Sequence, residues 1–267
     1  MNLMPIIDTA AVLVSLFFLV VGSISDLKTR EVDDKVWLFY GPLGVVLTAV
    51  RVVLDPSLFV LVGISFAIAF IISMGLFYFG LTGGADAKAI ICLGLTLPLP
   101  PSSWHPLIGF VHPFFPLVVV IMSFISSGSM ALWFCVRNTV SYARLKGRMF
   151  SGLEHESMSR KALAFASGYP TRIANLQSTF YLYPLEEVTP ASASHPGERH
   201  FKFFADIETD HGQLVSQFID AAKTLGVNET VWVTPGLPML LFIVIGLIIV
   251  LVFGDPIFGT ILRSVVH

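Results

Sequence analysis

Long apolar runs are the dominant pattern along this chain of 267 residues. A helix needs about 20 mostly apolar residues to cross a bilayer core of about 30 Å. Six stretches reach or approach that length, and polar segments separate them. They cover residues 5–25, 36–54, 58–80, 85 to 97 or 99, 113–136 and 237–253. The pattern predicts a mainly α-helical membrane protein with six transmembrane helices.

Proline and aspartate mark the ends of several stretches. The prolines of L-P-L-P-P at 97–101 end the fourth stretch, because proline lacks the N–H that an α-helix needs. The fourth stretch is therefore short for a full span. Asp55 and Pro56 predict a tight turn between the second and third stretches. We interpret Asp8, Asp55 and Asp255 as helix caps or interfacial residues, a common location for aspartate.

Residues 137–236 form the only polar segment large enough to fold outside a membrane. Within it, 200–208 has a strand-like pattern, 211–226 has apolar residues at helical spacing, and 231–233 is typical of a closing strand. Gly226 is a natural helix stop. We therefore expect a small mixed α/β domain inserted between the fifth and sixth helices. The predicted divisions are 1–136 with five helices, 137–236 as the soluble insert, and 237–267 with the sixth helix and the C-terminus.

The composition supports this class and excludes others. Only 13% of the residues are charged and the mean hydropathy is +0.80, whereas soluble domains carry about 25% charged residues. A formal net charge of −2 gives no reason to expect a nucleic-acid partner. Cys92 and Cys135 lie far apart, so we expect no disulfide scaffold and no metal site. We interpret His195, His200 and His211 as surface residues, and we expect no cofactor.

The basic residues predict an orientation in the membrane. Of the 16 Lys and Arg residues, 14 follow the first, third or fifth stretch or belong to the insert. The two exceptions are Arg51 and Arg263. Loops rich in Lys and Arg stay in the cytoplasm. We therefore expect a multi-pass protein of the cell membrane, with the insert in the cytoplasm and both termini outside.

Two aspartates fall at the cytoplasmic ends of predicted spans. Asp26 follows the first span and Asp86 begins the fourth, so the two carboxyl groups share a depth. Two carboxylates a few ångströms apart cannot both ionise easily and share one proton. One can then take a proton from water while the other protonates a scissile carbonyl. The pair would hydrolyse a peptide bond without a metal or a covalent intermediate.

The neighbours of Asp86 strengthen this hypothesis. Gly83 and Gly84 carry no side chains, so a substrate backbone could approach closely. A helix that starts near Ala85 places its positive end beside Asp86 and favours the anion. Lys88 would act in the same direction. The competing interpretation, which fits either aspartate taken alone, is a simple helix-end residue.

These residues resemble a known family. G-G-A-D-A-K at 83–88 is similar to the GxGD signature of membrane aspartyl proteases of the prepilin peptidase branch. Ser23, Asp26, Arg30 and Val32 resemble the first aspartate motif of that branch, S-x-x-D-x-x-x-R-x-V. The form of this motif and the polar insert are most similar to archaeal preflagellin (prearchaellin) peptidases.

The resemblance implies a function and a site. It implies an aspartic-type endopeptidase that removes short basic leaders from prearchaellin-like and prepilin-like precursors, with Asp26 and Asp86 as the catalytic pair. Gly83, Gly84 and Lys88 come with them as motif neighbours. Ala85 departs from strict GxGD, which has glycine there. The cysteine-rich domain of bacterial members is absent, so their methyltransferase activity is not implied.

An acidic cluster beside Asp26 suggests how a basic leader could be held. The cluster consists of Glu31, Asp33 and Asp34. We hypothesise that it attracts the basic residues of the leader, while an ordinary solvated loop is an equally good interpretation.

Two other functions remain open on the sequence. One is a presenilin-like or signal-peptide-peptidase-like protease that cuts within membrane spans. The other is a proton-coupled transporter or assembly subunit whose acids relay protons. A transporter predicts acids near the middle of the membrane and repeated halves. Here the acids lie at the inner edge, and no repeat is evident.

Overall fold

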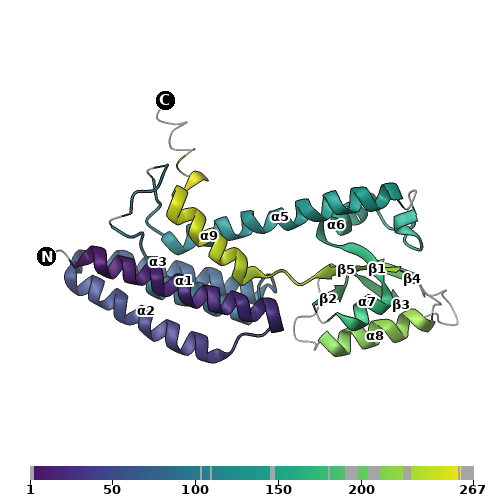
Figure 1. Ribbon diagram of the computed structural model, residues 1–267, viewed down its shortest axis with the longest axis horizontal. Coiled ribbons are helices and arrows are strands. Elements are labelled where there is room, and N and C mark those ends of the chain that lie inside the picture. Colours follow the sequence, from purple (N-terminus) through teal and green to yellow (C-terminus); the bar gives the residue numbers. More distant parts are fainter. Residues whose placement is uncertain are drawn as a thin grey trace. The chain divides into compact units, whose positions relative to one another are not determined.

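The computed structural model of the chain is mostly helical and divides into two compact units (Figure 1). It describes residues 3–102, 104–108, 110–144, 148–179, 181–189, 198–203, 211–224, 230–257 and 259. The first unit comprises Met1–Ser127 together with Pro238–His267, and the second comprises Gly128–Leu237.

Helices make up nearly all of the first unit. They are α1 (Met4–Thr29), α2 (Asp34–Leu54), α3 (Phe59–Tyr78), α4 (Gly84–Thr96), the first part of α5 (Phe115–Arg144) and α9 (Met239–Phe253), with a 3₁₀ turn at Pro56–Leu58. Four stretches of the described chain are long and apolar enough to cross a membrane: Met4–Thr29, Asp34–Leu54, Pro56–Tyr78 and Phe115–Ala143. The other two predicted spans are shorter helices, of 13 residues in α4 and 15 in α9.

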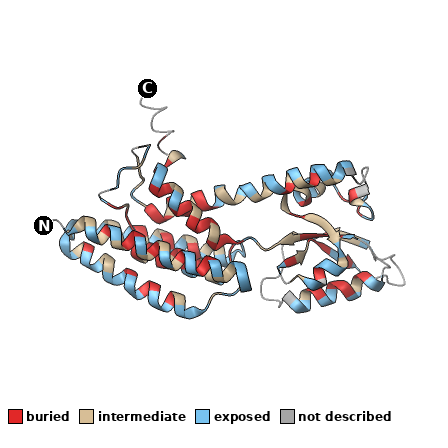
Figure 2. Ribbon diagram, viewed as in Figure 1, coloured by how far each residue is buried: buried red, intermediate tan, exposed pale blue. Residues whose placement is uncertain are grey.

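The outer surfaces of these helices are apolar. Phe17, Phe39 and Ile71, on α1, α2 and α3, are 63%, 66% and 68% exposed. Pale blue surfaces run along α1 and α2 in Figure 2. Large apolar side chains exposed in rows are unfavourable in water and normal against lipid tails. The helices are therefore those of a membrane protein.

Helix α4 lies among its neighbours and is largely buried. It packs against α1, α2, α3 and α9. Small residues allow this approach, since a Cβ on Gly44 would lie 2.1 Å from Thr96 Oγ1 and one on Gly94 would lie 2.9 Å from Ala69 Cβ. At about 1.5 Å per residue, α4 is about 20 Å long, less than the thickness of a bilayer core.

The end of this short helix is stabilised by side chains from α2 and α3. The last carbonyl groups of a helix have no partner within the helix, and in an apolar environment they need one. Thr48 donates to the carbonyl of Leu95, at 2.7 Å. Arg51 donates to the next loop at the carbonyls of Leu99 and Pro100, at 3.2 and 2.7 Å. Polar residues on apolar helices thus fix where α4 stops.

Asp8 has a different role from the helix cap or interfacial position expected from the sequence. Its side chain is 2% exposed and lies 3.4 Å from Arg51 Nε. It also accepts the N–H and the hydroxyl of Ser102, at 2.7 and 2.5 Å. A charge buried among apolar helices needs such a partner. Asp55 does cap, because its carboxylate accepts the N–H of Ser57.

The second unit contains two small antiparallel sheets. In the first, the strand order is β1 (Tyr169–Arg172), β5 (Thr230–Pro235), β2 (Leu182–Pro184), and in the second β3 (Glu186–Thr189) pairs with β4 (Glu198–Phe201). The remaining elements are a 3₁₀ turn at Arg148–Phe150 and helices α6 (Met158–Ser167), α7 (Ile173–Ser178) and α8 (His211–Thr224). This region confirms the expected mixture of helices and strands.

The predicted segments of this unit are found with shifted bounds. The closing strand at 231–233 is β5, the helix at 211–226 is α8, and the first residues of the strand at 200–208 belong to β4. Residues 204–210 and Gly226 lie outside the described part of the chain.

Two apolar clusters hold this unit together. One is formed by α8 and the first sheet, with Val215, Phe218, Ala222, Val231 and Val233 buried in it. The other surrounds Trp232 of β5, which is 1% exposed and contacts Phe150 and Phe201. Side chains of β5 alternate between the two clusters, as a strand with a period of two requires. This strand therefore joins the two halves of the core.

Candidate active site

Asp26 lies in the last turns of α1. The helix ends at Arg30, whose N–H donates to the carbonyl of Asp26 at 2.9 Å. Arg30 has φ 59°, the left-handed conformation common at helix ends but unusual for a residue other than glycine. The side chain of Asp26 is half-buried. A sharp chain reversal thus fixes Asp26 and Arg30 close together.

Asp86 lies in the first turn of α4. Its Oδ2 accepts the N–H of Gly83 at 3.0 Å, while the N–H of Ala87 donates to the carbonyl of Gly83 at 3.1 Å. This is the acidic half of a capping box, in which the third helical residue reaches back to the N-cap. The positive end of the helix dipole lies at the same place. The half-buried carboxylate is therefore held in one orientation.

The two aspartates share one electrostatic neighbourhood. Helix α1 packs against α4, and the charges of Asp26 and Arg30 both act on the carboxyl group of Asp86. Arg30 also acts on Asp26. The sequence identified Arg30 only as a motif residue and did not predict the left-handed turn that it forms at the end of α1.

Packing within the chain does not require the two glycines before Asp86. A Cβ on Gly84 would meet only Phe77, at an ordinary 3.8 Å, and one on Gly83 would lie 3.4 Å from Asp86 Oδ2. Gly83 has φ −74°, which any residue can adopt. The glycines therefore leave space beside the carboxylate that the described residues of the chain do not fill.

Lys88 lies beside an acid of the neighbouring helix. Its Nζ is 2.5 Å from Asp34 Oδ1, in an ion pair that joins α4 to the first turn of α2. The sequence predicts that Lys88 acts on Asp86, whereas the ion pair that Lys88 forms in the structure is with Asp34. Lys88 is therefore tied to the acidic cluster.

The three acids of that cluster have different surroundings. Asp33 caps α2, where it accepts the N–H of Lys35 at 2.9 Å, and this hydrogen bond lowers the pKa of Asp33 below its ordinary value. Asp34 is paired with Lys88. Glu31 is exposed, and its carboxylate has no ion pair with another described residue. Among the described residues, Glu31 therefore has no ionic partner, whereas Asp33 and Asp34 both have structural contacts.

Two family models match separate segments of the chain. The sequence model of the type IV leader peptidase family matches residues 13–135, which contain both aspartate motifs. A second model, the archaeal peptidase A24 C-terminus of type II, matches residues 160–256. Over residues 13–135 the chain belongs to the type IV leader peptidase family. As a member of this family the protein is a peptidase, which the sequence resemblance had implied.

Three curated relatives extend along most of the chain. The preflagellin peptidase of Methanocaldococcus jannaschii is 24% identical over 248 residues, which are 90% of this chain and 92% of the relative. Those of Methanococcus maripaludis and Methanococcus voltae are 24% and 25% identical, over 90% and 93% of this chain and 93% and 97% of the relatives. Similarity at this extent supports leader-peptide cleavage over the transporter and the signal-peptide-peptidase-like alternatives.

Proposed function

We propose that this leader peptidase is an aspartic endopeptidase, which removes short basic leaders from prearchaellin-like or prepilin-like precursors at the cytoplasmic face of the membrane. Three relatives carry the name preflagellin peptidase, which supports this class of substrate. The proposed catalytic groups are Asp26 and Asp86, and no metal or cofactor enters the reaction.

The observation that carries the proposal is the arrangement around Asp86. One oxygen of its carboxylate accepts the N–H of Gly83, and the nearby charges are those of Asp26 and Arg30. A carboxylate that only capped a helix would not need a second acid and an arginine beside it. Two acids within electrostatic range are suited to share a single proton. The nearby cation stabilises the negative charge that remains on the pair.

In the proposed reaction, the two carboxyl groups accept and donate protons in turn. The ionised carboxylate of the pair takes a proton from water, whose oxygen attacks the carbonyl carbon of the scissile peptide bond. The protonated carboxyl group gives its proton to the carbonyl oxygen. The tetrahedral intermediate then collapses: one of its hydroxyl groups returns a proton to the pair as the C–N bond breaks, and the leaving amine takes a proton from the pair, which regains its single shared proton. The cation of Arg30 stabilises the negative charge that the pair carries between these steps.

The open space at the two glycines gives the substrate its place. A side chain at Gly83 would extend to 3.4 Å from the carboxylate, so glycine keeps the approach to Asp86 open. We propose that the precursor's apolar helix lies against the lipid-facing helices and that its basic leader reaches Glu31. Asp33 and Asp34 add negative charge to the same surface.

The proposed topology has six spans, with the second unit in the cytoplasm and both termini outside. Helices α4 and α9 are too short to cross a full bilayer as straight helices, but they pack on longer neighbours. The stabilised carbonyls at the end of α4 support its place inside the apolar region, where backbone groups must be paired.

The test is cleavage of a prearchaellin-like precursor by the detergent-solubilised protein. Asp26→Asn and Asp86→Asn are isosteric, and asparagine at 86 keeps an oxygen that can accept the N–H of Gly83. Both variants should fold and lose cleavage by at least about 1,000-fold. Asp55→Asn is the matched control, since asparagine also caps helices, and it should cleave normally. Cleavage at the wild-type rate by either active-site variant would refute the proposed pair.

A further inference from the structure

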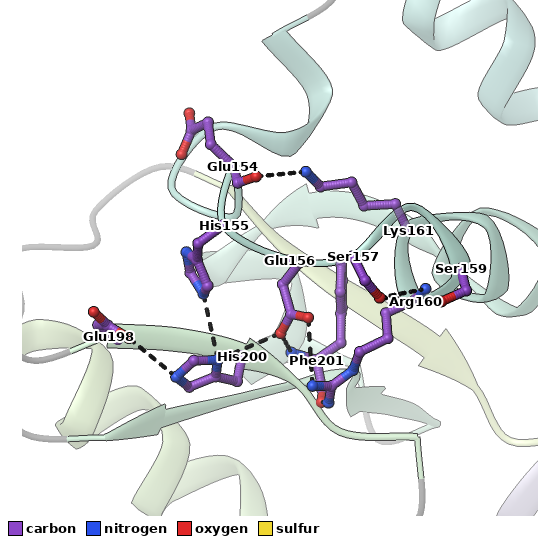
Figure 3. Close-up of polar contacts among 10 residues, drawn as sticks. All are labelled: Glu154, His155, Glu156, Ser157, Ser159, Arg160, Lys161, Glu198, His200 and Phe201. Atoms are coloured by element: carbon purple, nitrogen blue, oxygen red, sulfur yellow. Dashed lines mark hydrogen bonds and ion pairs between the residues drawn. The ribbon is translucent and has the colours of Figure 1, made fainter.

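Three side chains of types that can bind a metal ion gather in the second unit, which contains none of the residues assigned to catalysis. His155 and Glu156 lie in the turn before α6, and His200 lies on β4 (Figure 3). One donor atom from each lies within 4.8 Å of the others. The sequence predicts a surface position for His200, which lies 45 positions along the chain from His155. Only the pairing of β4 with β3 brings it to this turn.

Two of the three separations between donor atoms match those around a tetrahedral ion, and the third is within 4.8 Å. His155 Nε2 lies 3.3 Å from His200 Nδ1, which lies 3.4 Å from Glu156 Oε1. Two ligand atoms that each lie about 2.0–2.1 Å from a tetrahedral zinc ion are about 3.3 Å apart. Two imidazole nitrogens and one carboxylate oxygen are also a donor set that zinc accepts.

A second carboxylate orients the ring of His200. Glu198 Oε2 lies 3.3 Å from His200 Nε2, so the proton of a neutral His200 is best placed on Nε2. The lone pair of Nδ1 then points at a carboxylate oxygen and at another imidazole nitrogen. That arrangement is repulsive unless a proton or a cation lies between them. In proteins, a metal-bound histidine usually donates its other ring N–H to a carboxylate or a similar acceptor, which fixes the orientation of the ring.

Glu156 is held in place before any ion binds. Its side chain is 4% exposed, and Oε1 accepts the N–H of Phe201 at 2.8 Å. Arg160 lies on the other oxygen, 3.4 Å from Oε2. Oε1 keeps a second lone pair that faces His200. With two carboxylates and one guanidinium, the site has a formal charge of −1 while the histidines are neutral, and this favours a divalent cation.

We propose that His155, Glu156 and His200 bind one divalent cation of the zinc class, with Glu198 as the outer carboxylate and a water molecule in the fourth position. The ion ties β4 to the turn before α6, across a separation of 45 residues. It acts as a structural clamp of the second unit. Peptide hydrolysis by the proposed aspartates does not depend on its chemistry.

The test measures zinc on the full-length protein in detergent, purified through a tag that contains no histidine. The protein is stripped with a chelator, dialysed against zinc, and its metal content and dissociation constant are determined. Wild type should retain one zinc ion per chain. Co²⁺ in its place should give the visible absorption of a tetrahedral site. Glu198→Gln should weaken zinc binding by about 10- to 100-fold.

Two variants and one control separate a built site from surface binding. His155→Ala removes an exposed ligand with little effect on the fold, and His200→Ala removes the central one; both should lose the bound zinc. His105→Ala is the control, because His105 is an exposed histidine of the other unit, and it should keep the zinc. Zinc should also raise the unfolding temperature of wild type and not that of His155→Ala.

Two results would overturn the proposal. One is a wild-type protein that retains no zinc, which would mean that the histidines form only a hydrogen-bonded pair. The other is equal zinc content in wild type and His155→Ala, which would mean nonspecific binding. Both results leave the proposed peptidase function untouched, since the aspartate variants test that separately.

Discussion

The backbone N–H of Gly83 donates a hydrogen bond of 3.0 Å to Oδ2 of Asp86. On the sequence alone, a helix cap and a catalytic carboxylate are competing interpretations of this aspartate. In the structure the two are compatible, because capping uses one carboxylate oxygen and fixes the orientation of the other. A preorganised group loses little entropy when the substrate arrives. The cap therefore supports the proposed chemistry.

The glycines before Asp86 provide a first prediction. Gly83→Ala should fold like wild type, since its φ is negative and the new Cβ would make only a 3.4 Å contact with Asp86. It should nevertheless reduce kcat/KM for the precursor by about tenfold or more, because the methyl group would occupy the proposed approach of the substrate. The measurement is precursor cleavage together with the unfolding temperature.

Gly63→Ala is the matched control for this change. A Cβ at Gly63 would meet nothing within 4 Å, and the residue lies inside α3, in its second turn. It should keep full activity and gain slightly in stability, because alanine is the better helix former. Equal activity of Gly83→Ala and Gly63→Ala would contradict the substrate-approach role.

A second prediction distinguishes Arg30 from Lys88. Arg30 acts on both aspartates, whereas Lys88 is paired with Asp34 at 2.5 Å and is half-exposed. Arg30→Gln should lower the cleavage rate by about tenfold, equivalent to about 1.4 kcal/mol of transition-state stabilisation. Lys88→Met should change it by less than about threefold, since exposed ion pairs contribute little. The opposite order of effects would return Lys88 to the role expected from the sequence.

The acidic cluster gives a prediction about substrate charge. Glu31→Lys should raise KM for a precursor with a basic leader by about five- to tenfold at low ionic strength, and by less at high salt. A precursor with an acidic leader should be cleaved better by this variant than by wild type. Asp33→Asn keeps the helix cap and removes one charge of the same surface, so it should raise KM by a smaller factor. If Glu31→Lys leaves KM unchanged, the cluster does not attract the leader and is an ordinary solvated loop.

The second unit contains a buried ion pair whose loss should destabilise it. Glu186 is 2% exposed, and both of its oxygens accept hydrogen bonds of 2.8 Å from Arg199. Oε1 also accepts the N–H of Trp232. Arg199→Ala should lower the free energy of unfolding of this unit by about 3–5 kcal/mol, because it leaves a buried carboxylate without its cation. Thermal unfolding and limited proteolysis would measure this, and an unchanged profile would contradict it.

The same carboxylate gives a dependence on pH. Burial raises the pKa of Glu186 above its ordinary value, although Arg199 and the N–H of Trp232 act in the opposite direction. A raised pKa means that the folded state binds the proton more tightly than the unfolded state. The stabilisation that protonated Glu186 gives to the folded state is therefore complete at pH values below its ordinary pKa. It is lost as the pH rises through the pKa of Glu186 in the folded state. The stability of wild type relative to Glu186→Gln should fall over that range.

Much of the helical unit could be predicted from apolar runs. The first two helices are found within a few residues of 5–25 and 36–54, and α4 begins one residue before the predicted Ala85. Apolar length is a strong signal because the bilayer sets it. The same signal could not reveal that Asp8 is paired with Arg51, since that contact depends on how α1 and α2 pack.

The second unit was harder to predict. Its strands have three to six residues and lack a long alternating pattern, so the sequence identified only the segments around β4, α8 and β5. The contact of His155 with His200 joins a turn to a strand far along the chain. Local periodicity contains no information about such pairings, which depend on strand register.

The most direct test of the central claim compares Asp26→Asn, Asp86→Asn and the double variant in one precursor-cleavage assay, with substrate below KM. If the two carboxyl groups act as one unit, each single substitution should reduce kcat/KM nearly as much as the double substitution. Losses that multiply, so that the double variant is far less active than either single one, would mean that Asp26 and Asp86 act independently and would contradict the shared-proton mechanism.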